Sequence, residues 1–240
     1  MKFVEVLKAK TNDNPGTRTP IIAFLGDSVT QGCFEVYFKE GQLKTIFDSC
    51  QGYPERVKRI FSMLYPEAPI SVINAAVNGS SAPAGYERLK RDVLAFKPDL
   101  LVVCFGLNDS NAEMEGLDIY KEALRNIFTT ARQENIETIF MTPNMMNTDS
   151  SRISPGDPLE PLADLFAKRQ TGGLFDAYMD AAREVCKEEN VTLCDCYAIW
   201  KKMYECGVDT TKLLSNGLNH PIREMHEMFA WQLVHTILNN

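Results

Sequence analysis

Several features that would place this chain in a specialised class are missing from it. Its 240 residues contain no apolar run near the roughly 18 residues that a membrane-spanning helix needs. No Gly/Ser-rich or Pro-rich linker, block of like charges or internal repeat divides it, so we expect one domain over residues 1–240. Neither a Gly-x-Gly-x-x-Gly segment nor a Walker loop is present, which argues against a nucleotide or flavin binder.

The chain also lacks an excess of basic residues. Its net charge of −7 argues against nucleic acid as a partner, because phosphate binding needs clustered Lys and Arg. Residues 1–8 are interrupted by charge and contain no apolar core of a signal peptide. We therefore expect a cytoplasmic protein with no membrane partner.

Cysteine spacing gives no sign of a metal site. The chain has an odd number of cysteines, and Cys194-x-Cys196 lacks the two-residue spacing of a zinc or redox pair. We expect free thiols in a reducing compartment, no metal and no cofactor. The seven cysteines are Cys33, Cys50, Cys104, Cys186, Cys194, Cys196 and Cys206.

Apolar runs of strand length alternate with longer stretches of helical period. Continuous rather than alternating hydrophobicity indicates strands that are covered on both faces, as in a parallel sheet. The alternation predicts an α/β fold, a three-layer α/β/α sandwich with a mainly parallel five-stranded sheet. The predicted strands are 20–25, 70–75, 99–105, 136–142 and 191–196, and the predicted helices are 53–65, 84–96, 118–134, 174–190 and 222–238.

Two stretches, 33–52 and 145–172, are long for connections in a compact domain. Each follows the carboxyl end of a predicted strand, where open parallel sheets bind their ligands. We expect these stretches to be loops that carry function or cover a site, and the sequence leaves open whether they form a lid.

Polar segments follow three of the predicted strands. Gly26-Asp27-Ser28 follows the first, a segment ending in Asn78-Gly79 follows the second, and Gly106-Leu107-Asn108-Asp109 follows the third. A serine hydroxyl becomes a good nucleophile only when a base takes its proton, and the chain has only three histidines. His220, before the last predicted helix, is the candidate base.

Each of these residues also has a purely structural interpretation. Ser28 could cap a helix, Asn108 could form a turn and His220 could begin the last helix. His226 and His235 lie inside the last predicted helix, and we interpret them as structural. The nucleophile elbow of general α/β-hydrolases, Gly-x-Ser-x-Gly, does not fit, because Thr30 stands where its second glycine belongs.

Taken in order, the segments resemble the four blocks of the SGNH hydrolase superfamily, the GDSL esterases and lipases. The family's Ser, Gly, Asn and His correspond to Ser28, Gly79, Asn108 and His220. The resemblance spans nearly the whole chain and implies a flavodoxin-like sheet of about five parallel strands. It also implies a serine esterase in which Ser28 forms an acyl-enzyme and His220 is the base. The implied oxyanion hole consists of the Ser28 and Gly79 main-chain N–H groups and the Asn108 amide.

The sequence departs from the family at the acid of the triad. The family places an Asp three residues before its histidine, and that position is Gly217 here. We therefore predict a Ser–His dyad, in which the second ring nitrogen of His220 donates to a main-chain carbonyl or to the Asn216 amide oxygen. A carboxylate from elsewhere, such as Glu224, is a further alternative.

The resemblance implies a small-molecule ester as substrate. We favour short-chain carboxylic esters, O-acetylated carbohydrate among them, and expect activity to rise through the imidazole titration near neutral pH. One alternative is a catalytically weak or silent carbohydrate-binding relative. Another is a lysophospholipase or acyl thioesterase, and the oligomeric state stays open.

Overall fold

The computed structural model describes residues 1–240 and contains one five-stranded parallel sheet with the strand order β4-β1-β5-β6-β7. Numbered along the chain, these strands follow the order 2-1-3-4-5 of flavodoxin-like folds. The predicted parallel sheet is confirmed. Its strands are β1 (Ile21–Gly26), β4 (Ser71–Asn74), β5 (Leu100–Cys104), β6 (Glu137–Met141) and β7 (Thr192–Cys194).

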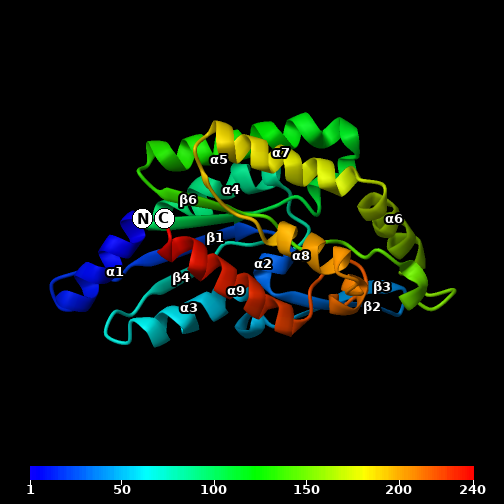
Figure 1. The fold of residues 1–240 in the computed structure, drawn as a ribbon, viewed down its shortest axis with the longest axis horizontal. Coiled ribbons are helices and arrows are strands. Elements are labelled where there is room, and N and C mark those ends of the chain that lie inside the picture. Colours follow the sequence, from blue (N-terminus) through cyan, green and yellow to red (C-terminus); the bar gives the residue numbers. More distant parts are fainter.

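Helices cover both faces of the sheet, which confirms the three-layer architecture (Figure 1). Helices α4 (Ala82–Asp92), α5 (Leu117–Gln133) and α7 (Leu174–Glu188) lie on one face. Helices α3 (Tyr53–Leu64) and α9 (Arg223–Leu238) pack against each other on the opposite face.

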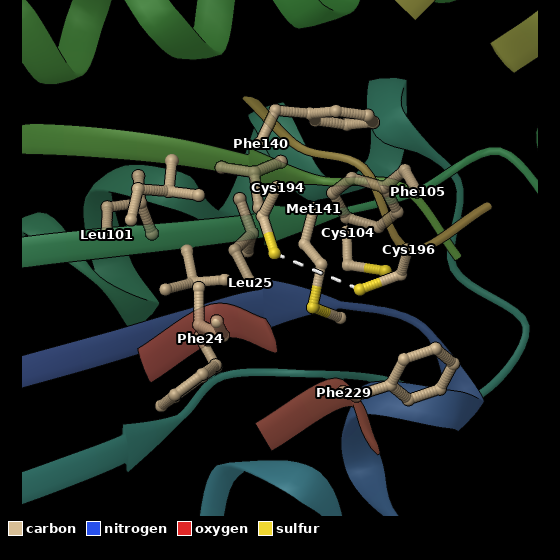
Figure 2. Packing of buried hydrophobic residues seen from close by; sticks show 14 of the residues in the cluster. Phe24, Leu25, Leu101, Cys104, Phe105, Phe140, Met141, Cys194, Cys196 and Phe229 are labelled. Atoms are coloured by element: carbon tan, nitrogen blue, oxygen red, sulfur yellow. Dashed lines mark hydrogen bonds between the residues drawn. The ribbon is translucent and has the colours of Figure 1, made fainter. Parts of the chain in front are cut away.

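The central strands β1 and β5 are apolar because side chains from both of their faces are buried. Phe24 and Phe140 point away from the sheet in opposite directions (Figure 2). The Phe24 ring packs against Tyr53 of α3 at a centroid distance of 5.6 Å, and Phe140 packs against Phe128 of α5 at 6.1 Å. The central strand β5 is buried over its whole length, so it forms a rigid base for the residues that follow it.

Residues 33–52 are not the irregular loop that the sequence predicted. They contain an antiparallel hairpin of β2 (Cys33–Lys39) and β3 (Gln42–Phe47). Glu40 and Gly41 form its turn with φ of 53° and 72°, as a two-residue type I′ turn requires. The prediction was wrong because the hairpin pairs only with itself and is largely exposed, so it has no continuous apolar run.

Four helices were also missed by the sequence prediction. The predicted loop 145–172 ends in α6 (Glu160–Thr171), which lies beside the hairpin end of the molecule in Figure 1. The predicted strand 191–196 extended two residues too far, because Asp195 caps the next helix by accepting a hydrogen bond from Ala198 N–H at 3.1 Å. The other missed helices are α1 (Lys2–Asn12), α2 (Ser28–Gln31) and α8 (Cys196–Glu205).

All seven cysteines are free, as the sequence predicted, and only Cys50 and Cys206 are exposed. Cys194 and Cys196 lie 3.8 Å apart between their sulfur atoms inside the apolar core (Figure 2). None of the helices combines the length and the apolar character needed to cross a membrane.

Candidate active site

Ser28 lies at the carboxyl end of β1, where the chain turns directly into the short helix α2. Asp27 caps this helix, its side chain accepting a hydrogen bond from Val29 N–H at 3.0 Å. Gly26 permits the turn, because a Cβ atom there would lie 2.2 Å from Thr30 Oγ1 and 2.9 Å from the Cys104 carbonyl oxygen. The Ser28 hydroxyl is thereby presented at the edge of the sheet from a rigid strand.

His220 lies in a tight loop just before α9. The Asn216 side-chain oxygen accepts hydrogen bonds from the main-chain N–H groups of Leu218, Asn219 and His220, each at 3.0 Å. Ser215 N–H donates to the His220 carbonyl at 2.7 Å and closes the loop from the other side. These bonds hold the His220 backbone in one conformation.

The fold brings Ser28 and His220 into contact across 192 residues of sequence. The Ser28 Oγ atom lies 2.9 Å from His220 Nε2, and His220 Nδ1 lies 3.1 Å from the Phe34 carbonyl oxygen. A carbonyl oxygen only accepts, so neutral His220 carries its proton on Nδ1 and has a free lone pair on Nε2. This tautomer can accept the proton of the Ser28 hydroxyl.

Of the partners considered for His220 Nδ1, the geometry selects a main-chain carbonyl. The Asn216 oxygen is engaged with main-chain N–H groups and does not contact the ring, so the prediction that it orients the imidazole is wrong. Glu224 is exposed and makes no hydrogen bond with His220. Sequence reasoning could not identify Phe34, because a carbonyl belongs to every residue and no side chain marks its position.

Both members of this pair are shielded from solvent, with Ser28 4% exposed and His220 5% exposed. Burial lowers the pKa of His220 to about 4, although the Phe34 carbonyl and the Glu35 carboxylate oppose the shift. The sequence predicted activity rising near neutral pH. With this pKa, His220 is already neutral there, and the rise belongs at more acidic pH.

Gly79 and Asn108 lie on the neighbouring connections, after β4 and β5. The main-chain N–H groups of Ser28 and Gly79 donate no hydrogen bond within the protein. Gly79 has φ of 75°, a conformation that favours glycine. One hydrogen of the Asn108 amide is used, because Nδ2 donates to the Ser80 carbonyl at 3.0 Å. This bond joins the segments that carry Gly79 and Asn108.

Asp109 holds these two segments together. Its carboxylate accepts hydrogen bonds from Ala82 N–H at 2.8 Å and from Gly106 N–H at 3.0 Å. Burial raises the pKa of Asp109 to about 6. The sequence placed Asp109 in the third block without a role, and its contacts give it a structural one.

The other two histidines lie in α9, as predicted. His226 is fully buried, and its Nδ1 accepts a hydrogen bond from Tyr53 N–H at 3.1 Å. Burial, reinforced by the positive charge of Arg56, lowers the pKa of His226 to about 3. His235 is exposed near the end of the helix. No group of three or more His, Cys, Asp or Glu side chains lies close enough to hold a metal ion.

The sequence matches a known protein family over most of its length. Residues 24–228 match the model of the GDSL-like lipase/acylhydrolase family. An acetylxylan esterase of Geobacillus stearothermophilus is 25% identical over 181 residues, which cover 69% of this chain and 79% of that protein.

Solved structures show the same fold. A lipase/acylhydrolase from Enterococcus faecalis is 25% identical and superposes with a TM-score of 0.64 over 91% of this chain and 95% of its own. The acetyl xylan esterase AlAXEase is 18% identical and has a TM-score of 0.66 over 90% of this chain and 99% of its own. Because the family model matches most of the chain, the chain belongs to the GDSL-like lipase/acylhydrolase family and is an ester-hydrolysing enzyme.

Proposed function

We propose that the enzyme hydrolyses short-chain carboxylic esters, with O-acetylated carbohydrate as the favoured substrate class, through an acyl-enzyme on Ser28. The observation that carries this proposal is the distance of 2.9 Å between Ser28 Oγ and His220 Nε2. It lies within the range in which a base takes the proton of a nucleophile, and the Phe34 carbonyl fixes the required tautomer.

In the first half of the reaction, Ser28 Oγ attacks the ester carbonyl carbon while His220 Nε2 takes the hydroxyl proton. The carbonyl π electrons move to oxygen, and this oxyanion accepts hydrogen bonds from the Ser28 and Gly79 N–H groups and the Asn108 amide. The imidazolium then gives its proton to the leaving alcohol oxygen as the C–O bond breaks. An acyl group remains on Ser28.

In the second half, water takes the place of the alcohol. His220 accepts a water proton as the oxygen attacks the acyl carbon, and the same donors stabilise the second oxyanion. The imidazolium returns the proton to Ser28 Oγ as the acyl bond breaks. The carboxylic acid leaves, and the dyad returns to its starting state with no net consumption of any group.

The relatives favour a small acyl group and a carbohydrate alcohol. Two relatives described above are esterases of acetylated xylan, a carbohydrate. Long acyl chains, which a lysophospholipase or acyl thioesterase takes, are the competing class.

The test measures hydrolysis of p-nitrophenyl esters of increasing acyl length and of acetylated xylo-oligosaccharides. We expect kcat/KM to be highest for acetate and acetate to be released from the oligosaccharides. Ser28→Ala and His220→Ala should each lower kcat by about 10³–10⁶. Ser62→Ala, which removes an exposed serine that donates to the Lys58 carbonyl, is the matched control and should keep full activity.

Two outcomes would contradict the proposal. A preference for long acyl chains would assign the enzyme to the lipid or thioester class. An unlabelled Ser28 after treatment with a fluorophosphonate, together with no ester hydrolysis, would indicate a silent binding protein.

A further inference from the structure

The hydrogen-bond partner of His220 supplies orientation but no charge. In a Ser-His-Asp triad the carboxylate both fixes the tautomer and stabilises the imidazolium that forms during the reaction. The Phe34 carbonyl can do only the first of these, because it is neutral. A second group is needed if the imidazolium is to be stabilised in this buried site.

We propose that the Glu35 carboxylate is this group, so that the two tasks of the missing triad acid are divided between adjacent residues of β2. This inference rests on the proposed function of Ser28 and His220. Glu35 is a positioning residue. Its ion pair with Arg223 keeps the Phe34 carbonyl within hydrogen-bonding distance of the His220 ring, and its charge stabilises the imidazolium.

The Glu35–Arg223 ion pair connects the hairpin to α9, the helix that follows His220. Arg223 Nη1 lies 2.5 Å from Glu35 Oε1, and Nη2 lies 3.2 Å from Glu35 Oε2. Arg223 is the first residue of α9, three positions after His220. The two-point contact therefore links the strand that carries the Phe34 carbonyl to the segment that carries the imidazole.

Three further contacts fix Phe34 itself. The Arg223 guanidinium lies 4.3 Å from the centroid of the Phe34 ring, whose other neighbour is His226 at a centroid distance of 4.8 Å. Ser215 Oγ donates to the Phe34 carbonyl at 2.8 Å, so this oxygen accepts from Ser215 and from His220 at once. The carbonyl cannot rotate away while these contacts hold.

The charges around His220 come from three elements. Glu35 lies on β2, Arg223 and His226 lie on α9, and Asp48 precedes α3 with its carboxylate 3.5 Å from Arg223 Nε. Burial lowers the pKa of His220, and Glu35 acts in the opposite direction to raise it. Arg223 instead contributes to lowering the pKa of His226. Of the two members of the ion pair, only the carboxylate has the sign of charge that stabilises an imidazolium.

The test compares Glu35→Gln with Arg223→Gln by measuring kcat and kcat/KM for p-nitrophenyl acetate as a function of pH. The informative part of the profile is its acid limb, where activity rises with pH as His220 loses its proton. Both variants break the same ion pair, but they remove charges of opposite sign. We expect Glu35→Gln to lower kcat about three- to tenfold and to move the acid limb to lower pH, with KM little changed. Arg223→Gln should move the limb to higher pH, and Glu35→Asp, which keeps the charge, should keep the limb near its wild-type position.

A matched control is available in the Arg125–Glu188 pair between α5 and α7. Its side chains are 32% and 44% exposed, compared with 35% and 36% for Arg223 and Glu35, and its N–O distance is 2.7 Å. Glu188→Gln should leave kcat and the acid limb unchanged, since this pair lies on the helix layer opposite α9.

Glu35→Gln and Arg223→Gln could lose activity equally, with no shift of the acid limb in either. That result would overturn the proposal that the Glu35 charge stabilises the imidazolium, and the ion pair would only hold the hairpin against α9. If one variant fails to fold, the direction of the limb shift in the other decides. Loss of activity in Ser28→Ala and His220→Ala with an unaffected Glu35→Gln would overturn this inference alone. A wild-type enzyme without ester hydrolysis would instead overturn the proposed function.

Discussion

The central sheet and the β2–β3 hairpin differ strongly in burial, yet both contribute to the candidate site. Every residue of β5 is buried, whereas β3 is exposed over nearly its whole length. The ends of the sheet strands present Ser28, Gly79 and Asn108, and the hairpin presents the carbonyl that orients His220. The difference indicates that the proposed nucleophile and oxyanion donors depend on the stability of the core. The orientation of the proposed base depends instead on a few hydrogen bonds between the first residues of the hairpin and the loop that carries His220.

The first prediction tests the difference in stability between the two regions. Leu101→Ala in β5 should lower the free energy of unfolding by about 2–5 kcal/mol, because the cavity forms in a fully buried layer. Leu43→Ala in β3, whose side chain is 51% exposed, should change it by less than about 0.5 kcal/mol. Urea unfolding measures both, and equal losses would contradict the assignment of the hairpin to the periphery.

The second prediction concerns a donor at the end of the sheet. Asn108→Ala should lower kcat about 10²–10³-fold, because one oxyanion donor is lost where charge develops. Asn14→Ala is the control, since its amide also donates to a main-chain carbonyl, that of Glu67, but at a distant exposed position. If Asn108→Ala were as active as this control, the oxyanion role of Asn108 would be wrong.

The third prediction uses the buried carboxylate beside the nucleophile. Burial raises the pKa of Asp27 from 3.8 to about 7, so the folded state holds its proton more tightly than the unfolded state. The stabilising contribution of this proton is complete below pH 3.8 and is lost as the pH rises through about 7. Asn cannot ionise, so the stability of Asp27→Asn relative to wild type should increase between pH 4 and pH 7 and then level off.

Urea unfolding of the Asp27→Asn variant and of wild type at a series of pH values measures this change. The side chain has one oxygen, Oδ2, that is buried without a hydrogen-bond partner, which is the physical reason that its charged form is costly. A difference in stability that stays constant over the whole range would show that Asp27 ionises as it does in the unfolded chain.

The fourth and smallest effect is expected at the hydrogen bond between Ser215 and the Phe34 carbonyl of the hairpin. Ser215→Ala removes one of the two hydrogen bonds to the Phe34 carbonyl and should lower kcat about fivefold, which corresponds to about 1 kcal/mol. KM and the melting temperature should change little, because the contact positions a catalytic group and adds little to the core. A melting temperature that falls while kcat stays at the wild-type value would show that Ser215 is only structural.

The same difference in burial explains what the sequence could predict. Strands β1 and β5 lie under helices on both faces, so they appear as apolar runs, and the polar residues after them marked Ser28 and Asn108 as candidates. Strand β3 has no buried face to produce a periodic pattern, so the hairpin was missed.

The partner of His220 was only partly predictable for a related reason. The absence of an acid at Gly217 indicated a dyad and left a main-chain carbonyl as one alternative. The choice of Phe34 depends on a contact between positions 186 residues apart, and it involves an atom that every residue has. Only the folded chain could decide between this carbonyl and Asn216.

An acyl-enzyme on Ser28 can be detected by mass spectrometry of the enzyme after acid quenching during turnover of p-nitrophenyl acetate. We expect one added acetyl group, located by peptide mapping on Ser28, and no acetylation of Ser28→Ala. His220→Ala should acquire the group far more slowly. An acetyl group on another residue, or undiminished hydrolysis by Ser28→Ala, would contradict the role of Ser28 as nucleophile.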